Sequence, residues 1–257
     1  MSQAAQVRIG TSGWVYKHWR NVFYPPKLAA NRWFEHYFCH FDTVEINCTF
    51  YGLPAASTFA RWAEQAPSGF VYAVKANKIL THLKRLHEPR EVLETMLDRA
   101  RELGQHLGPI LYQLPPHWGC DIERLRQFIS VLPVGLEHVF EFRDPSWLNN
   151  DVKALLADTG MNFCIHDLAG FPCPLCVTGP IAYVRFHGPM KAKHVGRYTP
   201  QQLREWAARI AGFQRAGHAV YAYFNNDAEG HAVINARELQ HLLRVKPLSG
   251  IVESTGV

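Results

Sequence analysis

The chain has 257 residues, of which 47% are hydrophobic and 19% are charged, a composition ordinary for a soluble globular protein with a full core. The net charge of +5 is too small to indicate a nucleic-acid partner by itself, because a few surplus lysines on a solvated surface give the same balance. No stretch approaches the roughly 18 apolar residues needed to cross a membrane, so we expect no membrane partner.

The N-terminal residues, the cysteines and the absence of a linker indicate the cellular location, the state of the thiols and the number of domains. Residues Met1–Ala5 lack the charged-then-apolar order of a secretory signal, so we expect a cytoplasmic location. Six unevenly spaced cysteines favour reduced thiols over a disulfide framework. No low-complexity linker divides the chain, so we expect one domain over 1–257, with a core over about 7–245 and a C-terminal tail over 246–257. Nothing in the sequence indicates the oligomeric state.

Eight short apolar runs, spread evenly along the chain, each end in polar or charged residues. We predict them to be strands at Val7–Gly10, Thr43–Asn47, Phe70–Lys75, Gly108–Gln113, His138–Arg143, Met161–Asp167, Ile181–His187 and Ala219–Asn226. Segments with helical spacing lie between them, at Phe59–Ala63, Val92–Leu103, Leu125–Leu132, Val152–Leu156, Leu203–Phe213 and Leu239–Leu243.

One helix carries a complete start signal. Thr199 can cap it, Pro200 suits its first position, and Gln202 lies where it can reach back to the cap. Strand and helix repeated eight times indicate parallel strands with right-handed crossovers. We therefore predict an α/β fold, a (β/α)8 barrel of the TIM type, and keep a doubly wound open sheet as the alternative. The connection between strands six and seven is expected to be irregular, because Ala169–Pro180 is rich in proline and glycine.

Catalytic groups of such barrels come from the carboxyl ends of the strands and the loops that follow them. Side chains alternate along a strand, so Glu45 and Asn47 point the same way, as do Glu141 and Arg143, and Arg185 and His187. A charged pair is costly against the outer helices but can meet opposite charges and water in the barrel mouth. The alternative is an internal salt-bridge network that only closes the barrel.

The motifs of the chain resemble a known family, the YecE-like proteins, a domain of unknown function with a barrel of the TIM type. The resemblance runs from about Arg8 to Leu243 and rests on Ile9–Trp14, Val44–Tyr51, Gln113–Pro116, Glu141–Arg143, Arg185–Gly188 and Tyr223–Asp227. It implies the barrel and marks the same polar strand ends. It implies no activity, cofactor or catalytic residue.

Charge and aromatic residues near the predicted mouth favour a small anionic molecule. Basic residues follow strand three, including Lys75, Lys78 and His82, and strand seven, at Lys191–Arg197, where barrels often hold phosphate. Trp14 and Tyr51 follow strands and could stack on sugars. The alternatives are solvated surface lysines and aromatic residues that only cover the core.

We predict an enzyme that acts by general acid and base catalysis on a small phosphorylated or sugar-like substrate. Glu141 is the candidate acid or base, and Arg143 and Arg185 would tune its pKa and bind the anion. His187 is the candidate second proton carrier, because imidazole titrates near neutrality. Lys75 as a Schiff-base nucleophile would need a desolvated pocket. The predicted substrate-binding residues are Trp14, Glu45, Asn47, Tyr51, Lys75, His82, Gln113, Asn225, Asn226 and Asp227.

Two other functions stay open. A metal-dependent phosphoesterase or nuclease would use the carboxylates as ligands for a divalent ion, but no ligand spacing supports a metal and the arginines oppose a cation, so we predict no cofactor. A nucleic-acid partner is correspondingly less favoured. The second alternative is a ligand-binding protein without catalysis. Cys173 and Cys176 could be half a zinc site or a redox pair, but their proline-rich loop favours an inert pair.

Overall fold

The computed structural model describes residues 5–190, 195–246 and 248. Its centre is an eight-stranded parallel sheet with the order β1-β8-β7-β6-β5-β4-β3-β2. The strands are β1 Val7–Thr11, β2 Thr43–Ile46, β3 Val71–Lys75, β4 Leu107–Gln113, β5 His138–Glu141, β6 Asn162–Asp167, β7 Ile181–Phe186 and β8 Ala219–Phe224. The predicted parallel barrel is thereby confirmed.

Strands β1 and β2 bring the two edges of the sheet together. They meet at a bridge between Ser12 and Glu45, and the Gly13 amide donates to the Glu45 carbonyl at 2.8 Å. Gly10 allows this approach, because a Cβ atom there would lie 2.2 Å from the Thr43 carbonyl oxygen. The sheet is thus a nearly closed barrel.

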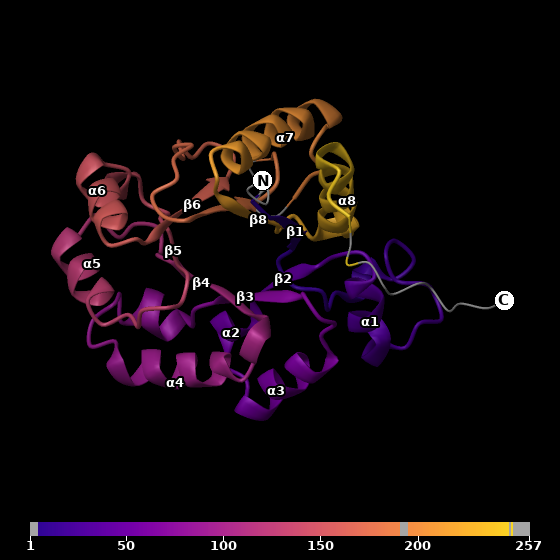
Figure 1. The fold of residues 1–257 in the computed structure, drawn as a ribbon, viewed down its shortest axis with the longest axis horizontal. Helices are drawn as coiled ribbons and strands as arrows, with labels where there is room; N and C mark the ends of the chain where they lie inside the picture. Colours follow the sequence, from indigo (N-terminus) through magenta and orange to yellow (C-terminus); the bar gives the residue numbers. More distant parts are fainter. Residues whose placement is uncertain (1–4, 191–194, 247, 249–257) are drawn as a thin grey trace.

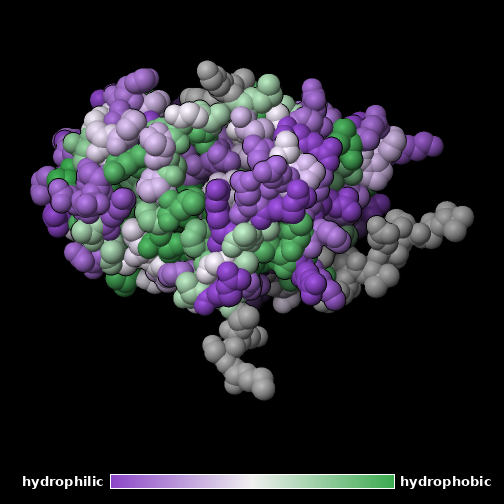
Figure 2. Space-filling view, turned by 90° about the horizontal axis from the view of Figure 1, so that it is seen from above, coloured by the Kyte–Doolittle hydropathy of each residue, from purple (hydrophilic) through white to green (hydrophobic). Residues whose placement is uncertain are grey.

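The helices lie around the strands (Figure 1), with their apolar sides against the outside of the barrel. In the described residues they are α1 Trp33–Phe38, α2 Cys48–Tyr51, α3 Ala56–Gln65, α4 Arg90–Arg101, α5 Ile122–Ile129, α6 Asn150–Asp158, α7 Pro200–Arg215 and α8 His231–Leu243. The connections between strands and helices contain six short helical turns in the described residues: η1 Lys17–Trp19, η2 Ala30–Arg32, η3 Ile79–Leu83, η4 Gly104–His106, η5 Pro145–Trp147 and η6 Ala228–Gly230. The face seen in Figure 2 is largely polar, with small apolar patches between polar side chains.

Two local predictions are confirmed. The α7 helix begins with the capping box of Thr199 and Gln202, with Pro200 in its first turn. Strand β6 leads to β7 through residues 168–180 without a helix. The Cys173–Cys176 segment lies in this connection, where burial raises the pKa of the Cys173 thiol to about 12 and also raises that of Cys176.

The inside of the barrel changes from apolar to polar along its axis. The part nearer the amino ends of the strands is filled by Ala73, Leu111, Val139, Cys164, Ile181, Tyr183 and Tyr223. Two residues further along β3, β4, β5 and β7, on the same face, come Lys75, Gln113, Glu141 and Arg185. The intervening residues, such as Phe140 and Val184, pack outwards against the helices. The alternation predicted for the charged pairs therefore places them inside the mouth.

No helix among the described residues is long and apolar enough to cross a membrane.

Candidate active site

The guanidinium of Arg185 lies at the centre of a buried ion-pair network. Its Nη2 atom donates to Glu45 Oε1 at 2.7 Å, and its Nη1 atom donates to Glu141 Oε2 at 2.6 Å. All three side chains have no exposed surface. Ser12 Oγ and the Tyr183 hydroxyl also donate to the Glu45 carboxylate, at 2.7 and 2.6 Å. Strands β2, β5 and β7 are thus joined across the barrel.

The Glu141 carboxylate is held as an anion. Burial alone would raise its pKa, but the charges of Arg143 and Arg185 outweigh burial and hold the pKa well below its ordinary value. Arg143 Nε donates to Oε1, and Arg185 occupies Oε2. A carboxylate without exposed surface, with both oxygens engaged, is suited to orienting the arginines rather than to exchanging protons with a substrate.

His187 also differs from the expectation of an imidazole that titrates near neutrality. Burial lowers its pKa well below the usual range, and the charge of Arg143 lowers it further. Arg143 Nη2 lies 2.7 Å from His187 Nε2, and because a guanidinium can only donate, Nε2 accepts. The other ring nitrogen, Nδ1, lies 3.2 Å from Asn225 Nδ2. His187 therefore helps to position Arg143.

A cavity of about 570 Å³ opens above this network, at the carboxyl ends of the strands. Arg143 joins the two, because it contacts Glu141 and His187 and also lines the cavity. The lining residues are Tyr16, Asn47, Phe50, Tyr51, Lys75, His82, Gln113, Pro116, Arg143, Asn225 and Asp227.

Lys75 ends β3 at this cavity, with 9% of its surface exposed. Its Nζ atom donates to Gln113 Oε1 at 2.8 Å and lies 4.1 Å from the centre of the Phe50 ring. Burial lowers the pKa of Lys75 to about 7, the charges of Arg185 and Arg143 lower it as well, and the carboxylates of Glu141 and Glu45 act against them. The desolvated pocket that a reactive lysine requires is therefore present.

His82 stands beside Lys75 on the η3 turn. Its ring packs against Phe50 at 4.9 Å, and its Nδ1 atom lies 2.9 Å from Thr81 Oγ1. Burial lowers the pKa of His82 to about 4, with a further contribution from the charge of Lys75. The ring is neutral at physiological pH, so it can accept a hydrogen bond.

Most of the predicted site residues come together at the mouth. Asn47, Tyr51, Lys75, His82, Gln113, Arg143, Asn225 and Asp227 line the cavity, and Glu45, Glu141, Arg185 and His187 form the network beneath it. Lys191, Lys193 and His194 of the predicted basic loop lie outside the described residues.

Trp14 and Asn226 lie away from the cavity. Gly13, with φ at +92°, turns the chain after β1. Trp14 consequently packs against Phe34 and Trp62, with ring centres 5.4 and 5.7 Å apart. The Asn226 amide donates to Gly196 O and to Asn235 Oδ1. These two side chains support the loops rather than meet a ligand.

Tyr16, Phe50 and Pro116 line the cavity but were not among the predicted site residues. Each belongs to a motif that follows a strand, so its position relative to the strand end was a usable signal. Phe50 is the most informative of them, because its ring contacts both Lys75 and His82.

The side-chain placement does not favour a metal at the mouth. Among the residues that the structure describes, no three His, Cys, Asp or Glu side chains are grouped to hold an ion. Glu45 and Glu141, which could have served as ligands, accept hydrogen bonds from Arg185 instead.

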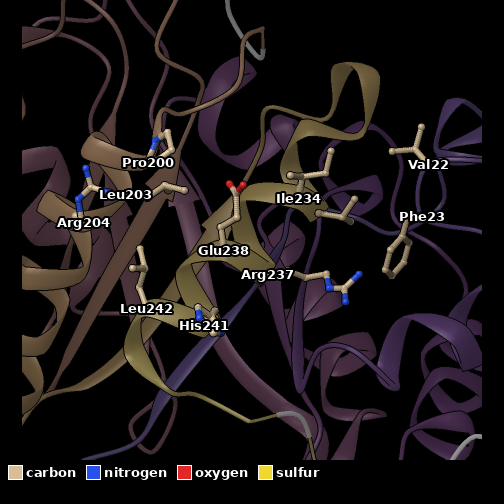
Figure 3. Close-up of a pocket in the computed structure, with 11 residues that line it drawn as sticks. Val22, Phe23, Pro200, Leu203, Arg204, Ile234, Arg237, Glu238, His241 and Leu242 are labelled. Atoms are coloured by element: carbon tan, nitrogen blue, oxygen red, sulfur yellow. The ribbon is translucent and has the colours of Figure 1, made fainter.

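A second cavity, of about 510 Å³, lies on the outside of the barrel between α7 and α8 (Figure 3). Apolar side chains such as Leu203, Ile234 and Leu242 line it, together with Arg204 and Arg237. None of the predicted site residues reaches it. We therefore place the candidate active site at the mouth, where the groups with displaced pKa values face the cavity.

Comparison with known proteins supports the family and the fold. Residues 8–253 match the family described as "Protein of unknown function DUF72". The UPF0759 protein YunF of Bacillus subtilis is 25% identical over 93% of this chain and 95% of its own length. The UPF0759 protein YecE of Escherichia coli is 27% identical over 50% of this chain and 47% of its own length.

Solved structures give the same result. The crystal structure of a DUF72 family protein from Thermotoga maritima is 26% identical and covers 93% of this chain and 99% of its own, with a TM-score of 0.83. A DUF72 family protein from Enterococcus faecalis, 19% identical, covers 96% of this chain and 100% of its own with a TM-score of 0.80, which shows the shared fold.

Proposed function

Because the chain belongs to the DUF72 family of proteins of unknown function, its activity must be inferred from its own site, and we propose an enzyme that moves a proton on a small anionic substrate bound in the mouth cavity. The observation that carries this proposal is Lys75, a buried amine at the cavity with a pKa of about 7. A group that titrates near the working pH can both accept and return a proton.

Arg143 is the proposed anion-binding group. Its guanidinium lines the cavity while Glu141 and His187 fix its Nε and Nη2 atoms. A guanidinium suits phosphate and carboxylate groups because it offers several donors in one plane. Its orientation is set before the ligand arrives, which reduces the entropy lost on binding.

The remaining cavity residues suit a substrate with hydroxyl groups. Asn47, Gln113 and Asn225 offer amides, and Tyr51 offers a ring face and a hydroxyl. Tyr16 offers a ring face, because its hydroxyl donates to the Ser12 carbonyl at 2.6 Å. In this proposal Lys75 is the proton carrier and neutral His82 accepts a hydrogen bond from the substrate, whereas Glu141, Arg185 and His187 act as positioning residues.

The first part of the test measures binding. Thermal shift is recorded with glucose 6-phosphate, glyceraldehyde 3-phosphate and glucuronate, each beside its neutral parent compound. We expect the anions to raise the melting temperature more than the neutral compounds do, and Arg143→Gln to remove the difference. Equal shifts for anionic and neutral compounds would contradict the proposed anion site.

The second part measures chemistry on any compound that binds. The protein is incubated with the compound in D₂O, and deuterium incorporation at carbon or product formation is followed by NMR. We expect turnover in the parent and in Lys78→Met, a matched change three residues away, and its loss in Lys75→Met. Binding without exchange or product in the parent would favour a ligand-binding protein instead.

A further inference from the structure

We propose, on the basis of the function proposed above, that Lys75 forms an imine with its substrate, so that the substrates are small aldehydes or ketones that carry a phosphate or carboxylate. A carbonyl carbon is the electrophile that an uncharged lysine amine attacks reversibly. The inference goes beyond proton transfer, because it assigns a covalent intermediate and a chemical class of substrate.

The partners of Lys75 are the first observation. Buried lysines are normally paired with a carboxylate, but none of the ion pairs formed by the described residues includes Lys75. Its hydrogen-bond acceptor is the neutral Gln113 amide, which also accepts from Arg185 Nη1 at 3.4 Å. Losing a proton therefore breaks no ion pair at Lys75.

The charge balance beneath Lys75 is the second observation. Two carboxylates, Glu45 and Glu141, already face two guanidiniums, Arg143 and Arg185. A protonated Lys75 adds a fifth, uncompensated charge to this set. Burial opposes this added charge most strongly, and no further carboxylate in the set compensates it. The neutral amine is the form with a lone pair for attack.

The position of the amine is the third observation. Nζ lies over the Phe50 ring at the cavity, and the His82 ring packs edge-on against the same ring. Arg143 lines the same cavity, where it can bind the anionic end of a molecule whose carbonyl group meets Lys75. One small molecule can thus engage both groups in a cavity of about 570 Å³.

Beyond the amine and the carbonyl compound, the proposed step requires only a proton from solvent water. The Nζ lone pair forms a bond to the carbonyl carbon, the carbonyl π electrons move to oxygen, and a proton passes from nitrogen to oxygen to give a carbinolamine. A proton taken up from solvent water protonates the hydroxyl, and loss of water gives the iminium ion; addition of water reverses the sequence and releases the proton again. His82 lines the same cavity, where its neutral ring can accept a hydrogen bond from the substrate.

The experiment traps the imine with glycolaldehyde phosphate as the probe and glycolaldehyde as its uncharged match. Sodium cyanoborohydride transfers a hydride to the iminium carbon and leaves a stable secondary amine, which intact mass and peptide mapping locate. At pH 7 we expect one adduct per chain, on Lys75, formed at least about tenfold faster with the phosphorylated probe. Lys78 and Lys84 in the same protein serve as internal controls.

Two variants complete the design. Lys75→Arg should abolish the adduct, and Arg143→Gln should reduce the preference for the phosphorylated probe. Circular dichroism checks that each variant is folded. Where a variant does not fold, the peptide map of the parent protein still shows which lysine carries the adduct.

The outcomes separate the two proposals. Labelling that spreads over the lysines in proportion to their exposure overturns the imine. Anions that stabilise the protein without any Lys75 adduct also overturn it but leave the proposed function intact. An adduct on Lys75 with no preference for phosphate supports the imine and contradicts the proposed anion site.

Discussion

Replacing Lys75 with methionine should stabilise the protein at neutral pH. The substitution removes the buried amine and keeps a side chain of similar length. Gln113 Oε1, which loses its 2.8 Å hydrogen bond from Nζ, still accepts from Arg185 Nη1 at 3.4 Å. The change therefore removes a poorly compensated cation without leaving the amide oxygen alone.

The size of the effect follows from the pKa. Lowering the pKa of Lys75 from 10.5 to about 7 corresponds to a cost of about 5 kcal/mol, at about 1.4 kcal/mol for each pKa unit. This value is an upper bound, because the variant also loses the Gln113 hydrogen bond and the contact with Phe50. We expect a gain of about 2–4 kcal/mol in the free energy of unfolding at pH 7.

The gain must depend on pH in one direction. Between about pH 7 and 10.5 the unfolded chain holds a proton on Lys75 that the folded protein has lost. The parent therefore becomes more stable, relative to the variant, as the pH rises through this range. The advantage of Lys75→Met is complete near and below pH 7 and disappears towards pH 10.5.

Urea unfolding at pH 7, 8, 9 and 10, followed by tryptophan fluorescence, measures the difference between parent and variant. In the difference between the two free energies of unfolding, the contributions of titratable groups that both proteins share cancel. Lys78→Met, on a partly buried lysine that follows β3, controls for the substitution itself. A variant that is less stable than the parent at pH 7, or a difference that does not change with pH, would refute a neutral Lys75.

Two further predictions concern the network and the barrel closure. Glu141→Gln removes the carboxylate that holds Arg143 and Arg185, and should lower the free energy of unfolding by about 3–5 kcal/mol in urea titrations. The control is Asp98→Asn, which replaces a carboxylate by an amide in an exposed pair with Arg101 and should cost at most about 1 kcal/mol. Gly10→Ala would place a methyl group 2.2 Å from the Thr43 carbonyl oxygen and should cost about 1–3 kcal/mol or more, whereas Gly212→Ala, in open space on α7, should stabilise by about 0.5–1 kcal/mol. Equal costs for Glu141→Gln and Asp98→Asn, or a neutral Gly10→Ala, would contradict these assignments.

The sequence was sufficient for the strands and for the side of each strand that its residues face. Alternation along β2, β5 and β7 is a geometric property of extended backbone, so Glu45, Glu141 and Arg185 had to share the inside once Val44, Phe140 and Val184 packed outwards. The shortest helical elements could not be predicted from the sequence. The α2 helix has four residues and the η3 turn five, too few for a hydrophobic period, yet they bring Phe50 and His82 to Lys75.

The chemical state of each site residue could not be predicted for a different reason. A sequence shows which titratable groups gather at the mouth, but the pKa of each depends on burial and on which charges are its nearest neighbours. Lys75 ends β3 and Glu141 ends β5, with β4 between them, and the sequence favoured the carboxylate as the proton carrier. In the structure the two arginines hold Glu141 as an anion, whereas Lys75 Nζ contacts the Gln113 amide and the Phe50 ring. Burial is the main reason that the pKa of Lys75 falls; the charges of Arg185 and Arg143 lower it further, and the carboxylates of Glu141 and Glu45 act against them. The salt-bridge network and the proposed active site, considered as alternatives from the sequence, are therefore compatible in one barrel, because the network orients Arg143 at the same cavity that Lys75 lines.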